Sequence, residues 1–335
     1  MFYNPWSKES SDFKDPETPP DSLPSDPFAQ YIYHEELDIS QYPSLARGKK
    51  PRRTIVVGDI HGHLQGFNDF LHQVRHDPAK DILVLAGDLV AKGPQTLAVI
   101  DRAIELNARC VRGNHDDKVI RWRGFLDSLS LQERNALDLQ QGNLDDDEVH
   151  DEVHEDDDEE EEEDENADLD EDLRAKVPSD LHRNSEHYRI ARAMTQSQYD
   201  YIRSCPLILT LPRALSVHHI PVHVVHAGID PRRDILHQRP WVLFNVRNLL
   251  KDGTPSRKKK KGQGWARAFN RLHTKRSPKM QDFLVLYGHD AGRSLNVRTW
   301  SIGIDTGCVY GRKLTGYMVE TGQLYSVDCT RNQRK

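Results

Sequence analysis

Long apolar runs are absent from this sequence: no stretch of 18 or more apolar residues occurs among its 335 residues. A transmembrane helix needs about 20 consecutive apolar residues, so none is expected. Residues 1–9 also lack the basic start and the apolar stretch that a secretory signal requires. We therefore expect a soluble, non-secreted protein, located in the cytoplasm by default, with the vacuole or the nucleus as alternatives.

Cysteine is scarce, and the four cysteines, Cys110, Cys205, Cys308 and Cys329, are scattered along the chain without close pairs. Zinc knuckles and disulfide-stapled domains have characteristic cysteine spacings, which are missing here. We therefore expect neither a zinc knuckle nor a disulfide framework. A reducing compartment fits this pattern best.

Basic residues are absent from residues 145–172, which contain 21 Asp or Glu and no Lys or Arg. Such a tract cannot bury enough apolar surface to offset the entropy lost on ordering, so we predict a disordered acidic insertion at about 143–178. Setting these 21 charges aside changes the formal net charge from −7 to +14. A basic body attracts polyanions such as nucleotides, RNA or polyphosphate, although a solubility charge without a target is the alternative.

Apolar periodicity is missing from residues 7 to about 50, which are rich in Pro, Ser, Asp and Lys. This composition is typical of disorder, and we predict a disordered N-terminal arm over residues 1–51. A single folded domain is then expected over 52–330, interrupted by the acidic insertion and followed by a short tail at 331–335. The domain is long enough to bury one sizeable core.

What the chain does contain, from Arg52 onward, is a regular alternation of short apolar runs and amphipathic stretches. Strands are predicted at 54–59, 82–88 and 110–115, and helices at 64–75 and 94–107. Pro94 is expected in a first helical turn, where its missing N–H has no partner to lose. This order is the βαβαβ pattern of an α/β protein. Further helices are expected at 116–142 and 186–203, and further strands at 222–226, 283–287, 301–305, 314–319 and 324–328.

Polar clusters bounded by glycine follow five of these predicted strands. They are Gly-Asp-Ile-His-Gly at 58–62, Gly-Asp-Leu-Val at 87–90, Gly-Asn-His-Asp at 113–116, Val-His-Ala-Gly at 225–228 and Tyr-Gly-His-Asp at 287–290. Open α/β sheets bind ligands beyond the carboxyl ends of their strands, so the clusters should converge. Carboxylate, imidazole and amide oxygen together suit divalent ions such as Mn²⁺, Zn²⁺ or Fe²⁺. Each motif alone is better explained as a strand-end turn, but five in order favour a metal centre.

These five motifs, in this order, resemble those of the calcineurin-like metallophosphoesterases. The resemblance implies an α/β fold in which a sandwich of two mixed β-sheets is flanked by helices. It also implies two divalent metal ions, which would be Zn, Mn, Co, Fe or Mg, and such a pair supplies Lewis-acid stabilisation to a phosphoryl group.

The resemblance also implies a ligand set for each ion. The first ion would be bound by Asp59, His61 and His289. The second would be bound by Asn114 and either His223 or His226, with Asp88 bridging the two ions. We favour His226 over His223 because Ala-Gly follows it, as in the family.

His115 follows the predicted ligand Asn114. By the same resemblance it would protonate the leaving oxygen as a general acid. A structural histidine beside the metal ligands is the alternative.

Further segments narrow the resemblance to the ApaH-like phosphatases, relatives of bacterial diadenosine tetraphosphatase. These are residues 87–94, 245–248, 288–291 and 305–311, and the similarity spans roughly Arg52 to Cys329 apart from the acidic insertion. Protein phosphatases of the wider superfamily carry an Asp-Arg pair where this chain has Ala91 and Lys92. The aspartate that orients the catalytic histidine is therefore absent, which disfavours a protein phosphatase.

The ApaH-like group includes fungal zinc-dependent endopolyphosphatases and protozoan enzymes that remove mRNA caps. The resemblance therefore implies hydrolysis of phosphoanhydrides, and we place inorganic polyphosphate first as the substrate. A serine/threonine protein phosphatase, a dinucleoside polyphosphate hydrolase and an mRNA-decapping enzyme are the alternatives. A silent polyanion-binding scaffold is disfavoured because Asp88, Asn114 and His115 are all present.

By the same resemblance, four cations of this chain would hold substrate phosphates, namely Lys92, Arg112, Arg247 and Arg293. Arginine offers a bidentate fork to phosphate and lysine a point charge. Arg112 and Arg293 are equally well explained as structural salt-bridge partners. The basic run at 257–261 would guide a long polyanion toward the metals, unless it is a solvated loop or a nuclear-import signal. Protein partners are unknown.

Overall fold

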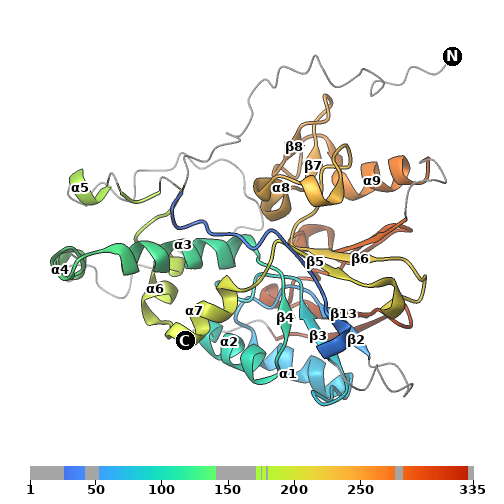
Figure 1. The fold of residues 1–335 in the computed structure, drawn as a ribbon, viewed down its shortest axis with the longest axis horizontal. Helices are drawn as coiled ribbons and strands as arrows, with labels where there is room; N and C mark the ends of the chain where they lie inside the picture. The colour runs from blue at the N-terminus through green and yellow to red at the C-terminus, as the bar shows by residue number, and fades with distance from the viewer. Residues whose placement is uncertain are drawn as a thin grey trace.

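The computed structural model describes residues 26–41, 53–140, 171–174, 176–178, 180–275 and 282–330. Two mixed β-sheets lie at its centre (Figure 1). The six-stranded sheet has the order β1 (His34–Glu36), β5 (Ile208–Leu211), β6 (Val222–Val225), β10 (Leu284–Tyr287), β12 (Ser301–Gly303) and β11 (Asn296–Val297). The five-stranded sheet has the order β14 (Gln323–Asp328), β13 (Lys313–Met318), β2 (Thr54–Val57), β3 (Ile82–Leu85) and β4 (Arg109–Cys110).

Apolar side chains fill the space between the two sheets. Val56 and Val84 of the five-stranded sheet and Val224 and Leu286 of the six-stranded sheet belong to one core cluster and are fully buried. Strands β2, β3 and β4 pair in parallel and are covered on both faces, which explains their continuous apolar runs. The α/β fold class, a sandwich of two mixed sheets flanked by helices, is thus confirmed.

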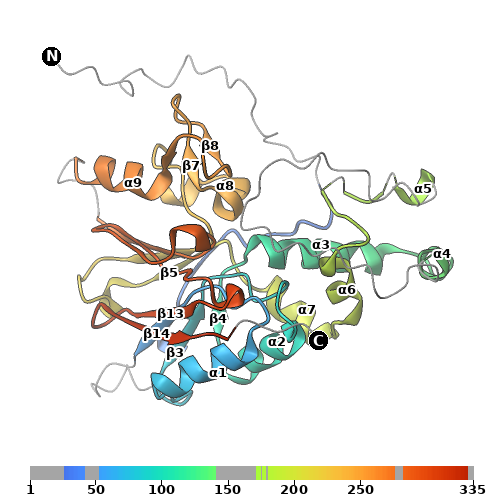
Figure 2. The same cartoon turned by 180° about the vertical axis from the view of Figure 1, so that it is seen from behind.

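Helices cover the outer face of each sheet (Figures 1 and 2). The five-stranded sheet packs against α1 (Leu64–Gln73), α2 (Thr96–Glu105), α3 (Asn114–Ser128) and α7 (Gln196–Arg203). The six-stranded sheet packs against α8 (Pro240–Asn245) and α9 (Trp265–His273). The remaining helices are α4 (Leu131–Gln140), α5 (Glu171–Arg174) and α6 (Glu186–Ala193).

Amphipathic spacing explains the helices that cover the sheets. In α1 the buried residues Phe67, Phe70 and Leu71 recur every three or four positions and face the core. Near α8 and α9 lies a small sheet of β8 (Pro255–Ser256), β7 (Asn248–Leu249) and β9 (Gln263–Gly264). Single 3-10 turns complete the chain at η1 (Ile39–Gln41), η2 (Arg213–Leu215), η3 (Ile235–His237), η4 (Ala291–Arg293) and η5 (Cys308–Tyr310).

The predicted βαβαβ order is present as β2, α1, β3, α2 and β4. One boundary was predicted wrongly, because α2 begins at Thr96 and leaves Pro94 outside the helix. Ala91 and Lys92 have positive φ angles of 67° and 65°, so the chain turns there before the helix begins.

The predicted disordered arm over 1–51 is wrong for residues 26–41. Within this segment β1 pairs in parallel with β5, and Leu37 is buried in the core between the sheets. The side chain of Asp26 forms an ion pair with Arg121. A three-residue strand of His-Glu-Glu gives no apolar signal in the sequence, which explains the error. The rest of the predicted arm lies outside the described residues.

The predicted acidic insertion at 143–178 extends too far toward the C-terminus. Leu173 and Val177 are buried among the residues that pack beside α3 and α6. The folded domain therefore continues by Leu173, before the predicted end of the insertion at 178. Residues 141–170 lie outside the described residues.

The expectation that the cysteines form no disulfides is wrong. Cys110 is bonded to Cys205 and Cys308 to Cys329, across sequence separations of 95 and 21 residues. Both pairs are created by the tertiary fold, so spacing in the sequence did not reveal them. Cys110 lies in β4 of the five-stranded sheet, and Cys205 precedes β5 of the six-stranded sheet. Cys308 lies between β12 and β13, and Cys329 directly follows β14.

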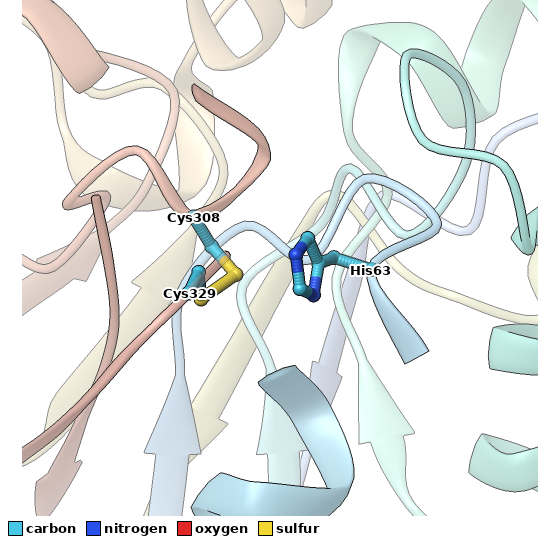
Figure 3. Close-up of side chains that lie close together, drawn as sticks. All are labelled: His63, Cys308 and Cys329. Carbon is cyan, nitrogen blue, oxygen red and sulfur yellow. A yellow bond between two sulfur atoms is a disulfide. The ribbon is translucent and has the colours of Figure 1, made fainter. Parts of the chain in front are cut away.

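The Cys308–Cys329 disulfide lies beside the imidazole of His63 (Figure 3). His63 Nδ1 accepts a hydrogen bond from the Gly66 N–H at 3.0 Å, and Nε2 donates to the Thr330 carbonyl at 2.9 Å. Both ring nitrogens and both sulfur atoms are thus engaged, and this buried group is structural.

Within the described ranges, no helix combines the length and the apolar character that crossing a membrane requires.

Candidate metal centre

The carboxyl ends of strands from both sheets meet at one edge of the sandwich. Asp59 and His61 follow β2, and Asp88 follows β3. Asn114 opens α3 directly after β4, while His226 follows β6 and His289 follows β10. The structure therefore brings all six predicted ligands to one place.

Asp88 lies at the centre of this cluster. Its Oδ2 atom is 3.5 Å from His61 Nε2 and 3.3 Å from His226 Nε2. Two groups of donors that share Asp88 are compact enough to hold a metal ion, one with His61 and His115 and the other with His226 and His289. Two adjacent sites joined by one carboxylate are the arrangement expected of a bridged pair of cations.

His289 lies in the group with Asp88 and His226, whereas the sequence analysis placed it with the first ion, beside Asp59 and His61. Its Nδ1 atom is 3.1 Å from Asn114 Oδ1, and His226 Nε2 is 2.9 Å from the same oxygen. The reason is the parallel pairing of β6 with β10, which continues as a hydrogen bond from the Gly288 N–H to the His226 carbonyl. Residues that follow these two strands are therefore neighbours.

Hydrogen bonds orient two of the imidazoles toward the cluster. His61 Nδ1 donates to the Val90 carbonyl and His226 Nδ1 donates to the Ala86 carbonyl, each at 3.0 Å. These contacts leave Nε2 of each ring directed at Asp88, and Nε2 is the nitrogen through which each histidine would bind a metal ion.

Two buried polar atoms at the centre support cation binding. Asp59 Oδ1 and His289 Nε2 have no hydrogen-bond partner among the described residues. A buried polar atom without a partner is rare and destabilises a fold by about 1–3 kcal/mol. A cation would satisfy both lone pairs, and the set of carboxylate, imidazole and amide donors suits a divalent ion.

Two glycines permit the carboxylates to approach the backbone. A Cβ atom on Gly113 would lie 2.1 Å from Asp88 Oδ1, and one on Gly288 would lie 1.9 Å from Asp59 Oδ1. Left-handed φ angles also occur at the ligands His61, Asp88 and His289, at 48°, 48° and 68°. Such strained backbone persists where the surrounding structure enforces it, typically at functional sites.

Electrostatics at the centre favour positive charge. Burial raises the pKa of Asp59 well above its ordinary value, and the nearby Asp305 carboxylate raises it further. Burial alone would raise the pKa of Asp88, but His226 and His115 hold it well below its usual range. Burial opposes protonation of His226, yet Asp88 raises the pKa of this histidine to about 9. Crowded carboxylates of this kind are stabilised by a cation.

Asp116 and Asp305 support the cluster, and the sequence analysis did not assign either to the site. The Asp116 carboxylate accepts hydrogen bonds from Leu89 and Gly113 at 3.0 Å, which ties the loop after β3 to the start of α3. The sequence did contain a signal for this role of Asp116. It is the third residue of a helix that begins after Gly113, a position from which an acidic side chain binds the N–H of the capping residue. Asp305 was noted within 305–311 but not placed beside Asp59.

Comparison with known proteins agrees with this geometry. Residues 52–293 match the family model described as calcineurin-like phosphoesterase. The chain belongs to the calcineurin-like phosphoesterases. Membership makes it a hydrolase of phosphoric ester or anhydride bonds, and the family implies divalent metal ions as cofactors.

Relatives of this phosphoesterase include bacterial proteins named symmetrical bis(5'-nucleosyl)-tetraphosphatase. The protein from Coxiella burnetii is 25% identical over 84% of this chain and 93% of its own length. The protein from Ectopseudomonas mendocina is 27% identical over 82% of this chain and 98% of its own length. A higher identity of 48%, to the protein from Edwardsiella ictaluri, is confined to 65 residues, which are 19% of this chain and 23% of that relative.

A solved structure assigned provisionally as a diadenosine tetraphosphatase has the same fold. It is 24% identical to this chain, with a TM-score of 0.58, and the match covers 90% of this chain and all of that one. These similarities place the phosphoesterase in the ApaH-like branch of its family.

Two of the four predicted phosphate-binding cations lie beside the metal cluster. Lys92 is close enough to His61 and His115 to lower the pKa of each, after burial, which has the larger effect. Arg247 acts in the same way on His289, again after burial. Positive charge therefore flanks both groups of metal ligands.

The other two cations are held in structural contacts. The Arg112 guanidinium is fully buried, donates to the Arg203 carbonyl at 2.9 Å and stacks on the Tyr31 ring. Arg293 pairs with Asp290 and donates to Asn248 Oδ1 at 2.7 Å. These contacts agree with the structural alternative for both residues.

His223 lies outside the cluster. Its Nδ1 atom is 2.9 Å from Thr210 Oγ1, and its ring contacts the ring of Phe283. His115, in contrast, lies at the cluster: its backbone N–H donates to Asp88 Oδ1 at 3.0 Å, and its ring packs against that of His61.

Proposed function

We propose that this phosphoesterase cleaves phosphoanhydride bonds within a chain of phosphates, with inorganic polyphosphate as the first candidate substrate. The observation that carries the proposal is the pair of cations that flank the metal ligands. Lys92 lies beside His61 and His115, and Arg247 lies beside His289. Successive phosphates of one chain would meet the metal centre and a cation at each side of it.

The basic run at 257–261 supports a long substrate. Asn248 Nδ2 donates to the carbonyls of Lys258, Lys259 and Lys261, each at 2.8 Å, which fixes the loop beside β7. A Cβ atom on Gly292 would lie 3.7 Å from Lys259 Nζ, so this ammonium group lies close to the loop that follows His289. A fixed cluster of cations near the site favours polyanions by electrostatic attraction.

The residues of this chain have distinct roles in the proposed reaction. When bound, the two divalent ions supply Lewis-acid stabilisation of the phosphoryl group and activation of the attacking water. Lys92 and Arg247 bind nonreacting phosphate oxygens and orient the chain. His115 protonates the leaving oxygen as the bond breaks.

A bis(5'-nucleosyl) tetraphosphate is the second candidate substrate. The relatives that cover more than four fifths of this chain carry that activity in their names. Both candidates contain phosphoanhydrides, so the same residues would act on either. The mRNA-decapping and protein phosphatase alternatives have no further support from the site.

The test compares the two substrates directly. Metal-stripped protein is reloaded with Zn²⁺, Mn²⁺, Co²⁺ or Mg²⁺, and the products from long-chain polyphosphate and from diadenosine tetraphosphate are measured, with Asp88→Asn as the control. Metal-dependent shortening of polyphosphate that disappears in the variant supports the first candidate. Cleavage of the dinucleotide alone replaces it with the second, and inertness toward both rejects the proposal.

The metal and the location of the protein are also proposals. Four histidines at or beside the cluster favour Zn²⁺, Mn²⁺, Co²⁺ or Fe²⁺ over Mg²⁺, which prefers oxygen ligands. The two disulfides are typical of an oxidising compartment, so of the three candidate locations we propose the vacuole. Fractionation of cells that express the chain tests this location.

A further inference from the structure

The candidate general acid His115 has a partner that the sequence did not predict. Ala91 occupies the position where protein phosphatases carry the aspartate that orients this histidine. In this chain His187 Nε2 lies 2.8 Å from His115 Nδ1, and the two rings are nearly coplanar, with centroids 5.0 Å apart and planes 19° apart. We propose that His187 is a positioning residue, which holds the His115 ring so that its Nε2–H faces the leaving oxygen.

The fold carries His187 to this place by helix packing. His187 is the second residue of α6, and the Ser185 side chain caps that helix by accepting from the Tyr188 N–H. The Tyr188 ring packs against the edge of Trp122 in α3, at a centroid distance of 4.9 Å. Since α3 also carries His115 in its first turn, the position of His187 relative to His115 is fixed by buried contacts between the two helices.

The first turn of α6 also supports a second part of the site. The Glu186 carboxylate accepts a hydrogen bond from the Lys92 N–H at 2.7 Å. Lys92 and Ala91 have left-handed φ angles, so this contact holds a strained turn. Neighbouring residues of one helix thus position both the candidate general acid and the backbone of a candidate phosphate-binding lysine.

The hydrogen bond is chemically suited to a proton donor. In the proposed arrangement His115 donates from Nδ1 to His187 Nε2, which lies 2.8 Å away, and its Nε2–H remains available to the leaving group. When that proton moves to the leaving oxygen, the His115 ring returns to the neutral form that keeps its Nδ1–H. His187 Nε2 accepts the same hydrogen bond before and after the transfer, so the ring orientation is preserved and no other group is required to gain or lose a proton.

The inference rests on the proposed role of His115 but not on the proposed substrate. Aryl phosphates therefore make good probes, because they report the metal centre and the general acid without a long phosphate chain. Phenyl phosphate has a poor leaving group that needs protonation, whereas 4-nitrophenyl phosphate has a good one that needs little. General acid catalysis contributes about 10²–10⁴-fold in rate, so its loss is measurable on the first substrate.

The experiment uses the metal-loaded full chain and three variants. His187→Leu removes the acceptor, His187→Gln supplies an amide oxygen near the position of Nε2, and Arg189→Gln changes an exposed residue of the same helix. We expect His187→Leu to lower kcat on phenyl phosphate by on the order of 10²-fold, and on 4-nitrophenyl phosphate by a few fold, at unchanged KM. The Gln variant should recover most of the loss, and the Arg189 variant should behave as the parent.

Two further measurements separate positioning from structural damage. Metal content and the thermal unfolding midpoint should be the same in all variants. In ¹⁵N spectra of the holoprotein, the His115 Nδ1–H signal should be present in the parent and in His187→Gln, and broadened by exchange in His187→Leu. This signature does not depend on turnover, so it remains decisive if aryl phosphates are hydrolysed slowly.

The proposal is overturned if both leaving groups lose activity equally, if the loss follows metal content or KM, or if Gln is no better than Leu. An unchanged His115 Nδ1–H signal in His187→Leu also overturns it. Failure of the phosphoanhydride proposal has a different signature, because polyphosphate and dinucleotide would then be inert while the aryl phosphates remain substrates.

Discussion

The two sheets contribute different chemistry to one metal centre. The five-stranded sheet and its helices supply Asp59, His61, Asp88 and Asn114, while the six-stranded sheet supplies the imidazoles of His226 and His289. Negative charge on the ligands therefore comes from one side only. Each sheet alone therefore forms only half of the site, and the charge balance of the site depends on how the two sheets pack.

The two sides also differ in how their loops are held. On the five-stranded side, the Asp116 carboxylate accepts hydrogen bonds from backbone N–H groups of two separate loops. On the six-stranded side, the adjacent parallel strands β6 and β10 set the positions of His226 and His289. Substitutions on the five-stranded side and on the six-stranded side should therefore have unequal effects on the metal centre.

The largest effect is expected from the carboxylate that contacts both sides. Asp88→Asn keeps the shape but removes the charge shared by His61 and His226. We expect turnover to fall by about 10⁴-fold, equivalent to about 5.5 kcal/mol, because both cations lose a ligand. Steady-state kinetics and metal analysis measure this, with Asp69→Asn on the exposed face of α1 as a matched control. Full metal content with normal turnover would refute the bridging role.

The next effect compares how much each of the two disulfides stabilises the fold. Replacing Cys110 and Cys205 by Ser opens a loop of 95 residues, and replacing Cys308 and Cys329 opens one of 21 residues. The chain-entropy model assigns about 4.7 kcal/mol to the first disulfide and about 3.3 kcal/mol to the second. Urea unfolding of the two double variants should therefore show a greater loss for the first. The reverse order would show that local packing beside His63 outweighs chain entropy.

A smaller effect should distinguish the two metal sites. His226→Gln removes a ligand from the six-stranded side and leaves the group of His61 and Asp88 intact. We expect one of the two ions to bind on the order of 10²-fold more weakly, which a titration with a chelator measures. The matched control is His223→Gln, three residues earlier in β6. The ring of His223 lies against Thr210 and Phe283 and outside the metal cluster. Loss of both ions together would mean that the sites are not separable.

The five-stranded side of the site was the part that the sequence predicted best. The residues of the βαβαβ unit and the five strand-end motifs were found because glycine, carboxylate and histidine recur after apolar runs. Those signals are local. The proximity of His289 to His226 was not predicted, because it depends on β10 lying beside β6, which strand patterns do not specify.

Features created by tertiary packing were not predicted. The disulfides join cysteines that are distant in sequence, and His187 lies 72 residues from His115 with no motif around it. Strand β1 is too short and too polar to have an apolar pattern. The partners of the Arg112 guanidinium were not predicted for a related reason, because the sequence does not show that Tyr31 and Asp117 lie beside it.

The smallest predicted effect contrasts two histidines of one strand and its following loop. Burial between Thr210 and Phe283 lowers the pKa of His223 to about 4, whereas Asp88 raises that of His226 to about 9 against the effect of burial. Because the folded pKa of His223 lies below its unfolded value of about 6.5, the unfolded chain binds more protons between these values. The stability contributed by neutral His223 is present above pH 6.5 and is lost as the pH falls toward 4.

His223→Gln should therefore make the protein less sensitive to acid. Between pH 7.5 and pH 5.5, we expect the parent to lose about 1 kcal/mol more unfolding free energy than the variant. Urea unfolding of both proteins at the two pH values measures this difference, and the other histidines cancel because both proteins contain them. Equal losses would mean that folding leaves the pKa of His223 unchanged, and would contradict the argument. A larger loss in the variant would reverse the sign of the argument, since it would require the folded state to bind the proton more tightly than the unfolded chain.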